Sequence, residues 1–319
     1  MDLDSFDLEI LNQLDMDARQ PYSQIGKVLR RSKQFVGQRI KNLTEKKIIE
    51  GYLLDVDLRS LGYTLFSIFL QFQGLTKMKE KRLMEYLGKS KYVGFCIKTL
   101  GNWDLFISIR AEDINDFYEF LGNFHKFCAK SIKKESINLE VRGIATNLKF
   151  LSKNEKITIH NSANTDKPKK EIFKESEKKV LNELRKFPLI TYLDLAKKCN
   201  KSYDTLKNII KKFQDKKIIK TTRAIINTEK LGYDRYLFLI ELGLMGNKNI
   251  EEIQHYLMRH KNIDYIIEGL GSWNIICDVY SRDTAELITV IDDIKSKFSA
   301  IQSIEFLKVI KNEKEVFNI

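Results

Sequence analysis

Long apolar runs are absent from this 319-residue sequence: no stretch approaches the roughly 18 residues that a membrane-spanning helix needs. The N-terminus, Met1-Asp2-Leu3-Asp4, is acidic and lacks the basic start and apolar stretch of a signal peptide. Both absences predict a cytoplasmic protein. The four cysteines form no CxxC pair, and Cys96, Cys128 and Cys277 lie in apolar runs. We therefore expect reduced, buried cysteines rather than disulfides.

Histidines are too few and too dispersed to indicate a metal site. The four histidines show no ligand spacing, and His255 and His260, five residues apart, would not share one face of a helix. The sequence also lacks a nucleophile elbow, a glycine-rich phosphate loop and a pair of carboxylates at a useful spacing. We therefore expect no metal, no cofactor and no catalytic activity.

The sequence contains an internal repeat in two copies. A shift of 170 residues brings it into register with itself, and the matching residues include Leu61-Gly62-Tyr63 with Leu231-Gly232-Tyr233, Gly101 with Gly271, and Trp103 with Trp273. Two copies at this period indicate a duplication rather than a solenoid of many short units. The polar stretch between the copies carries Pro168 and clustered Asn, Ser and Thr, which is typical of a linker.

The first fifty residues of each copy have the pattern of a three-helix helix-turn-helix followed by a strand. Apolar residues recur at helical spacing, and in the first copy the expected helix caps are Asp4, Ser23 and Ser32. Ser202 is the corresponding cap of the third helix in the second copy.

The net charge of +12 concentrates in these helix-turn-helix segments. Residues 23–50 carry eight Lys or Arg against two Glu, and residues 193–220 carry nine Lys against three Asp, so each segment has a net charge of +6 and the rest of the chain sums to zero. A solvated surface would not gather the whole net charge into two equivalent segments. Phosphate binding by two DNA-binding heads explains the pattern better, and double-stranded DNA is the expected partner.

Polar residues off the apolar stripe of each third helix are candidates for DNA contact. Gln can pair bidentately with adenine and Arg with guanine, whereas Lys33 and Lys41 are expected to hold phosphates. The candidates are Lys33, Gln34, Gln38, Arg39 and Lys41 in the first copy and Tyr203, Lys207, Asn208 and Lys211 in the second. Because Ile209 takes the place of Arg39, the second head should recognise different bases or bind less strictly. A degenerate head that only grips the phosphate backbone is the alternative.

The last hundred residues of each copy predict the order β-α-β-β-α-β. In the first copy the expected strands are 65–72, 92–99, 103–111 and 136–141, and the expected helices are 79–87 and 113–127. Asp113 and Asp283 are placed to cap the second helix of each copy. The order is that of a ferredoxin-like unit with a four-stranded antiparallel sheet, so the predicted fold class is α+β in tandem duplication.

The predicted division of the chain follows from these patterns. Its parts are a helix-turn-helix domain at 1–52, a ferredoxin-like domain at 53–151, a polar linker at 152–174, a second helix-turn-helix domain at 175–222 and a second ferredoxin-like domain at 223–319.

The ordered combination KNLTEKKIIEGY, LGY and GNWDLFISI resembles the Lrp/AsnC family of feast/famine transcriptional regulators. The resemblance covers both copies and implies ACT/RAM-like sensing domains, dimerisation through these domains and an amino-acid effector. By similarity, Gly101 and Asp104 match the Gly-x-x-Asp turn near the family's effector site, and Gly271 and Asn274 take their places in the second copy. The loss of the carboxylate at Asn274 puts a second equivalent ligand site in doubt.

The fusion itself departs from the family norm of one unit per chain. It implies a covalent pseudo-dimer with the two sheets packed on each other, which could assemble further, and an asymmetric DNA site with one stricter and one looser half. Two alternatives remain. Sirohaem decarboxylases resemble this arrangement, but the segments KYVGFCIKTLGNW and NIDYIIEGLGSW lack the histidine of their His-Asn-Tyr-type motif. An interaction adaptor whose heads no longer bind DNA is the other.

Overall fold

The computed structural model describes residues 3–151, 157–161, 173–243 and 247–314. The first copy contains α1 (Ser5–Met16), α2 (Tyr22–Leu29), α3 (Lys33–Glu45), β1 (Ile49–Val56), β2 (Thr64–Phe72), α4 (Lys77–Lys89), β3 (Val93–Leu100), β4 (Leu105–Ala111), α5 (Ile114–Cys128), η1 (Ala129–Ser131), β5 (Ile132–Thr146), η2 (Lys149–Leu151) and β6 (Ile159–Asn161). The second copy contains α6 (Glu175–Lys186), α7 (Tyr192–Lys198), α8 (Tyr203–Asp215), β7 (Ile219–Ile226), η3 (Glu229–Leu231), β8 (Asp234–Leu242), α9 (Asn247–Arg259), β9 (Ile263–Leu270), β10 (Ile275–Ser281), α10 (Thr284–Lys297) and β11 (Ile301–Lys314). Among these helices, none is long and apolar enough to cross a membrane.

Most of the expected helix caps are present. Asp4, Ser32, Ser202, Asp113 and Asp283 each accept backbone N–H groups at the start of their helices.

The expectation that Ser23 caps the second helix is wrong, because α2 begins at Tyr22 with Pro21 at the N-cap position. The carbonyl of Pro21 accepts the N–H groups of Gln24 and Ile25 and starts the helix without a side-chain cap.

Backbone geometry repeats with the same period as the sequence. Left-handed φ angles occur at pairs of positions separated by 170 residues, and these pairs are Arg30 with Asn200, Lys47 with Lys217, Gly62 with Gly232, and Gly101 with Gly271. Two of the pairs hold non-glycine residues, which adopt this conformation only where the surrounding fold imposes it. The duplication therefore extends from sequence to local turn geometry.

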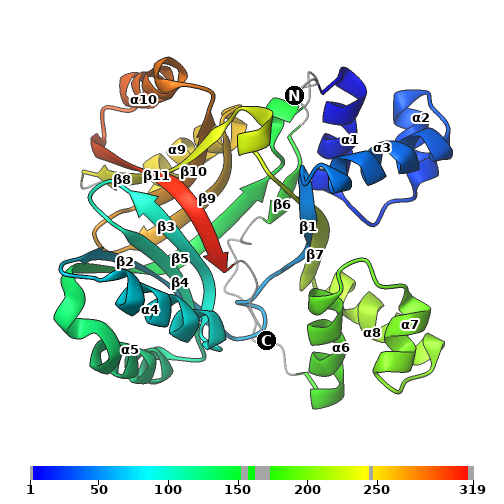
Figure 1. Ribbon diagram of the computed structural model, residues 1–319, viewed down its shortest axis with the longest axis horizontal. Helices are drawn as coiled ribbons and strands as arrows, with labels where there is room; N and C mark the ends of the chain where they lie inside the picture. Colours follow the sequence, from blue (N-terminus) through cyan, green and yellow to red (C-terminus); the bar gives the residue numbers. More distant parts are fainter. Residues whose placement is uncertain (1–2, 152–156, 162–172, 244–246, 315–319) are drawn as a thin grey trace.

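Each copy builds a four-stranded antiparallel sheet in ferredoxin-like order, namely β5-β2-β4-β3 in the first copy and β11-β8-β10-β9 in the second. Helices α4 and α5 lie beside the first sheet, and α9 and α10 lie beside the second (Figure 1). The predicted β-α-β-β-α-β units are confirmed.

The two sheets are joined edge to edge, which the sequence did not predict. The C-terminal part of β5 pairs with β9, from Leu139 opposite Leu270 to Ala145 opposite Tyr265, and the C-terminal part of β11 pairs with β3. Since β5 also pairs with β2, the strands close into a ring, with β6 attached outside it. The expected strand 136–141 is thus only the middle of β5, whose extra length reaches the other copy.

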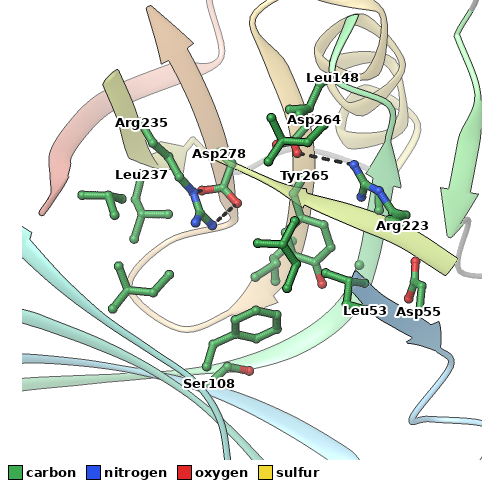
Figure 2. Close-up of a pocket in the computed structure, with 18 of the residues that line it drawn as sticks. Leu53, Asp55, Ser108, Leu148, Arg223, Arg235, Leu237, Asp264, Tyr265 and Asp278 are labelled. Carbon is green, nitrogen blue, oxygen red and sulfur yellow. Dashed lines mark hydrogen bonds and ion pairs between the residues drawn. The ribbon is translucent and has the colours of Figure 1, made fainter. Parts of the chain in front are cut away.

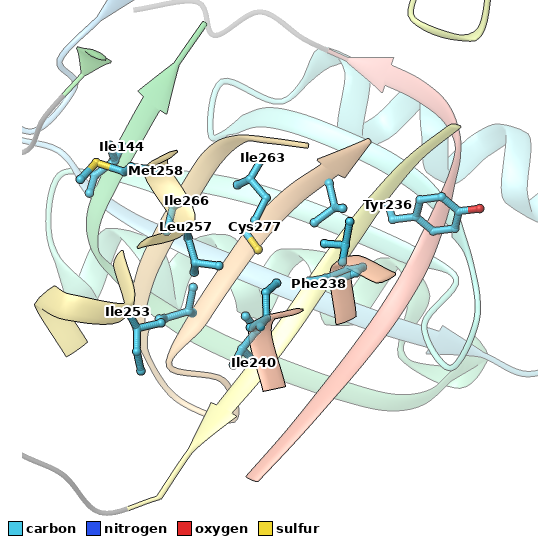
Figure 3. Packing of buried hydrophobic residues seen from close by; sticks show 14 of the residues in the cluster. Ile144, Tyr236, Phe238, Ile240, Ile253, Leu257, Met258, Ile263, Ile266 and Cys277 are labelled. Atoms are coloured by element: carbon cyan, nitrogen blue, oxygen red, sulfur yellow. The ribbon is translucent and has the colours of Figure 1, made fainter. Parts of the chain in front are cut away.

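Buried apolar residues separate into cores on the two sides of this ring. Outer cores lie between each sheet and its helices, and Figure 3 shows the one in the second copy, where Ile144 of the first copy packs with Phe238, Leu257 and Cys277. A further core inside the ring combines both copies and includes Phe69, Phe106, Leu237, Ile267 and Trp273. All four cysteines are free and buried, as expected.

A two-stranded ribbon joins the helix-turn-helix heads. Strands β1 and β7 pair antiparallel, with Leu53 opposite Arg223, and the heads lie at either end of this ribbon (Figure 1). Each strand also packs on the head of the other copy: Leu54 of β1 lies in the core of the second head, and Ala224 of β7 in the core of the first.

The segment interpreted as a linker, 152–174, lies largely outside the described residues. Its described parts are ordered. Strand β6 pairs with the end of β5, and Phe173 is buried in the core of the second head. Two pieces of this segment therefore belong to the folded units on either side.

Candidate nucleic-acid interface and central cavity

The third helix of each head presents most of the predicted DNA-contacting residues to solvent. The exposed candidates are Lys33, Gln34, Gln38 and Lys41 on α3 and Tyr203, Lys207, Asn208 and Lys211 on α8. Lys41 lies 3.8 Å from Glu45 on the next turn, and Gln38 Nε2 donates to Asn42 Oδ1 at 2.9 Å. These are exposed contacts of the kind that water or DNA readily replaces.

Arg39 differs from the other candidates because the structure places it between α1 and α3. Its guanidinium lies 2.8 Å from the Asp4 carboxylate and 3.2 Å from that of Asp7, and it covers the ring of Phe35. The equivalent Ile209 is buried in the core of the second head. Arg39 and Ile209 thus each join helices within their own head. The helical pattern did not predict this role, because both residues lie at the margin of the apolar stripe.

The heads also contact each other directly. Arg19, in the turn after α1, donates from Nη2 to the carbonyl oxygen of Ile190 at 2.8 Å and from Nη1 to that of Pro188. Its guanidinium lies over the ring of Tyr192. Together with the ribbon, this contact determines how α3 and α8 are arranged relative to each other.

The residues predicted to bind an effector lie in the β3–β4 and β9–β10 hairpins. Asp104 Oδ2 accepts the N–H of Phe72 at 2.7 Å, and Asn274 Oδ1 accepts the N–H of Leu242 at 2.7 Å. Both side chains therefore satisfy the same backbone donor in their own copy. A neutral amide oxygen can accept this backbone hydrogen bond as well as a carboxylate can. The hairpin therefore keeps its structure with Asn274 in place of an aspartate.

The β3–β4 and β9–β10 hairpins each pack against the last strand of the other copy. A Cβ atom on Gly101 would lie 2.8 Å from Leu307 of β11, and one on Gly271 would lie 2.5 Å from Asn138 Oδ1 of β5. Asn138 Nδ2 in turn donates to the carbonyl of Trp273 at 2.5 Å. The rings of Trp103 and Trp273 meet edge to face at 5.5 Å, so the hairpins fasten the two copies together.

The Gly271→Ala variant should lower the free energy of unfolding by about 2–3 kcal/mol. The reason is that φ is +153° at this position and the new methyl group would meet Asn138 Oδ1 at 2.5 Å and the carbonyl oxygen of Ile137 at 2.7 Å. Urea unfolding followed by circular dichroism measures the change. Gly122→Ala on α5, where nothing lies within 4 Å, is the control and should be neutral or stabilising. Equal losses in both variants would contradict this assignment.

A cavity of about 530 Å³ lies between the ribbon and the inner face of the ring. Leu53 and Asp55 come from β1, Arg223 from β7, and Tyr265 and Asp278 from the ring strands (Figure 2). Its apolar wall consists of residues from both copies, among them Phe95, Ile97, Phe106, Leu237, Ile267 and Ile276.

Two buried ion pairs stand beside this cavity. Arg223 Nη2 lies 2.6 Å from Asp15 Oδ1 of α1, and Arg235 binds both oxygens of Asp278 at 2.8 and 2.9 Å. Arg223 also lies 3.9 Å from Asp264 (Figure 2). The first head is thus tied through Arg223 to the ribbon and to strand β9 of the second copy.

Burial changes the ionisation of several groups at this site. Burial, followed by the neighbouring Asp278 carboxylate, raises the pKa of Asp264 to about 7. Burial also raises the pKa of Glu140, which accepts from the Ser67 and Ser108 hydroxyls, and that of Asp55. Burial lowers the pKa of Lys149 to about 8.

Sequence reasoning missed this cavity and its charges. The available signal was the presence of ionisable residues inside apolar strands, such as Asp278 between Cys277 and Val279. Nothing local indicated that these residues would meet, because they come from α1, β1, β7, β9 and β10. In the described part of the chain, no group of three or more His, Cys, Asp or Glu is arranged to hold a metal ion.

Comparison with known proteins agrees with this architecture. Residues 173–220 match a family model described as winged helix-turn-helix DNA-binding. The chain is 33% identical to the HTH-type transcriptional regulator LrpA of Pyrococcus abyssi over 123 residues, which span 38% of this chain and 84% of that protein. It is 30% identical to the regulatory protein AsnC of Haemophilus influenzae over 139 residues, 43% of this chain and 90% of that protein.

A solved structure covers both copies at once. The crystal structure of the siroheme decarboxylase NirDL aligns with 98% of this chain and 93% of its own, with a TM-score of 0.64 and 15% sequence identity. At this identity the likeness shows a shared fold. The regulators, in contrast, match over about one copy and at higher identity. The chain therefore belongs to the Lrp/AsnC family of transcriptional regulators, with the family's unit present in two tandem copies.

Proposed function

We propose that this protein is a sequence-specific DNA-binding regulator whose two heads act as a covalent pseudo-dimer and respond to a small ligand. The observation that supports it best is the exposure of basic and amide side chains on both α3 and α8, which lie in the segments 23–50 and 193–220 that each carry a net charge of +6. Each of these helices would enter the major groove, with lysines on phosphates and amides on base edges.

The two heads should not read DNA equally. Gln34 and Gln38 on α3 correspond to Asp204 and Asn208 on α8, and a carboxylate at position 204 disfavours the approach of a phosphate. Arg39 is paired within its head, so the difference between the halves rests on these other positions. We propose an asymmetric site in which the first head discriminates bases more strictly.

Charge reversal on α3 tests DNA binding. The double variant Lys33→Glu, Lys41→Glu should weaken binding to a selected DNA site by about 100-fold or more at physiological salt, because two phosphate contacts become repulsive. Fluorescence anisotropy with DNA selected from random sequence provides the measurement. A charge reversal of two lysines on α8, Lys207→Glu with Lys211→Glu, should reduce affinity less.

A control variant carries the same charge reversal on a helix outside the heads. Lys79→Glu with Lys81→Glu alters exposed residues of α4 and should change affinity by less than about three-fold, since α4 lies away from both heads. Affinity should also fall steeply with salt. A flat salt response, or equal losses in the α3 and α4 variants, would favour an interaction adaptor instead.

The fold shared with NirDL makes the enzyme alternative directly testable. The cavity-lining residues are rich in Arg, Asp and Glu, and none of those described is a histidine. Incubation of the protein with sirohaem, followed by analysis of the tetrapyrrole, should return the substrate unchanged. Formation of a decarboxylated product would show that the chain has an enzymatic activity, and would contradict the proposal that it acts as a regulator alone.

A further inference from the structure

The ionisable residues around the central cavity are not balanced in charge. Eight carboxylates line it against four guanidinium groups, and the lining side chains are Asp15, Glu50, Asp55, Asp57, Glu140, Glu229, Asp264 and Asp278 against Arg59, Arg185, Arg223 and Arg235. Two of the arginines are already committed to the buried pairs with Asp15 and Asp278. The inner wall therefore holds more carboxyl groups than guanidinium groups to pair with them.

Asp264 shows this excess most clearly. Its side chain is 11% exposed, and Oδ1 is buried without a hydrogen-bond partner among the described residues. Arg223, its cationic neighbour in the ribbon, lies at 3.9 Å and binds Asp15 at 2.6 Å. A buried carboxylate that lacks a close partner is destabilising unless something satisfies it.

An apolar surface lies in the same cavity. Phe95 and Phe106 line it from the first sheet. Leu237 of β8 and Tyr265 of β9 line it from the second (Figure 2). The volume of about 530 Å³ falls within the range of small-molecule sites, in which a few polar groups orient a largely apolar ligand.

We propose that this cavity is a binding site for an organic cation, an amine carried on a compact apolar body, with Asp264 as the partner of the ammonium group. The ammonium would pair with the Asp264 carboxylate, and the apolar body would lie against the phenylalanines. An anionic ligand fits less well, since Arg223 and Arg235 are paired with Asp15 and Asp278 and Arg59 donates to the backbone oxygen of Glu140. The fourth guanidinium group, that of Arg185, interacts electrostatically with Asp55.

The position of the site connects it to the heads. Arg223 belongs to the ribbon, pairs with Asp15 of the first head and lies beside Asp264. A cation on Asp264 would compete with Arg223 for that carboxylate and alter the ribbon between the heads. This regulatory part rests on the proposed DNA-binding function, whereas ligand binding itself does not.

Calorimetry with two probes of opposite charge tests the binding step. The probes are 2-phenylethylamine and 3-phenylpropionate, titrated into the full chain at mildly alkaline pH, where Asp264 is ionised. The amine should bind at least about ten-fold more tightly. Asp264→Asn should weaken amine binding about ten-fold, whereas Asp292→Asn, the same change on the exposed surface of α10, should have no effect.

A second variant covers the case in which Asp264→Asn fails to fold. Leu237→Phe adds bulk to the apolar wall and should reduce amine binding while Asp264 remains in place. Tighter binding of the carboxylate, or unchanged amine affinity in both cavity variants, would overturn the site.

Anisotropy with the selected DNA then separates the two proposals. Saturating amine should change the DNA affinity of the wild type about five-fold or more and leave that of Asp264→Asn unchanged. DNA binding that ignores a bound amine would overturn the coupling, and absence of DNA binding with intact amine binding would overturn only the proposed function.

Discussion

Replacing Phe69 with alanine is expected to lower the free energy of unfolding by about 3–5 kcal/mol, the usual range for removal of a large buried aromatic. Phe69 is fully buried in the core inside the ring. Its ring lies 4.7 Å from that of Trp273, in the other copy, and 5.0 Å from that of Phe106. The variant therefore opens a void where the two copies meet.

Urea unfolding monitored by tryptophan fluorescence measures this loss, because Trp103 and Trp273 both pack near Phe69. Tyr118→Ala provides the control, as Tyr118 is an aromatic residue on α5 that is 76% exposed. It should change stability by no more than about 0.5 kcal/mol. A similarly small loss for Phe69→Ala would mean that the copies do not depend on the shared core.

Removal of the Asp15 carboxylate should be similarly costly. Asp15→Ala leaves Arg223 buried without its closest partner and removes the acceptor of the Leu148 N–H, which lies 2.6 Å from Asp15 Oδ2. Breaking one side of a buried pair costs about 3–5 kcal/mol. Thermal and urea unfolding of the variant measure the change.

A double variant distinguishes the pair from simple loss of packing. Asp15→Leu together with Arg223→Met removes both charges of the pair and should be less destabilising than Arg223→Met alone, which leaves the buried carboxylates of Asp15 and Asp264 without their shared cation. Lys178→Met is the surface control. It breaks an exposed pair with Glu175 and should change stability by less than about 0.5 kcal/mol. Additive losses in the double variant would show that the two residues act independently.

The helix-turn-helix heads could be predicted because their signals are local. A helix cap such as Ser32 or Ser202 acts within three residues, and the apolar periodicity of α3 or α8 spans one helix. The ferredoxin-like order was accessible for the same reason, since each strand alternates within a few residues. The lengths of β5 and β11 were not, because their C-terminal parts pair with β9 and β3, which belong to the other copy.

The candidate sites likewise include parts that the sequence predicted and parts that only the tertiary structure shows. Exposure of Lys33 and Lys41 followed from the helical period. The ion pairs of Arg39 depended on how α1 packs on α3, which the period of α3 alone does not specify. The cavity depended on many elements of both copies meeting, so its carboxylates carried no recognisable spacing along the chain.

The sequence by itself determined that this protein is a duplication, that the segments 23–50 and 193–220 of its helix-turn-helix heads together carry a charge equal to the net charge of the chain, and that each head is followed by a β-α-β-β-α-β unit. These features depend on composition and on contacts between residues close along the chain. The tertiary structure alone decided that the two sheets close into one ring, that β1 and β7 join the heads, and that acidic side chains surround a cavity. Each of these results from pairing between residues of opposite copies, such as Ala145 with Tyr265 or Leu53 with Arg223, whose partners no local pattern identifies.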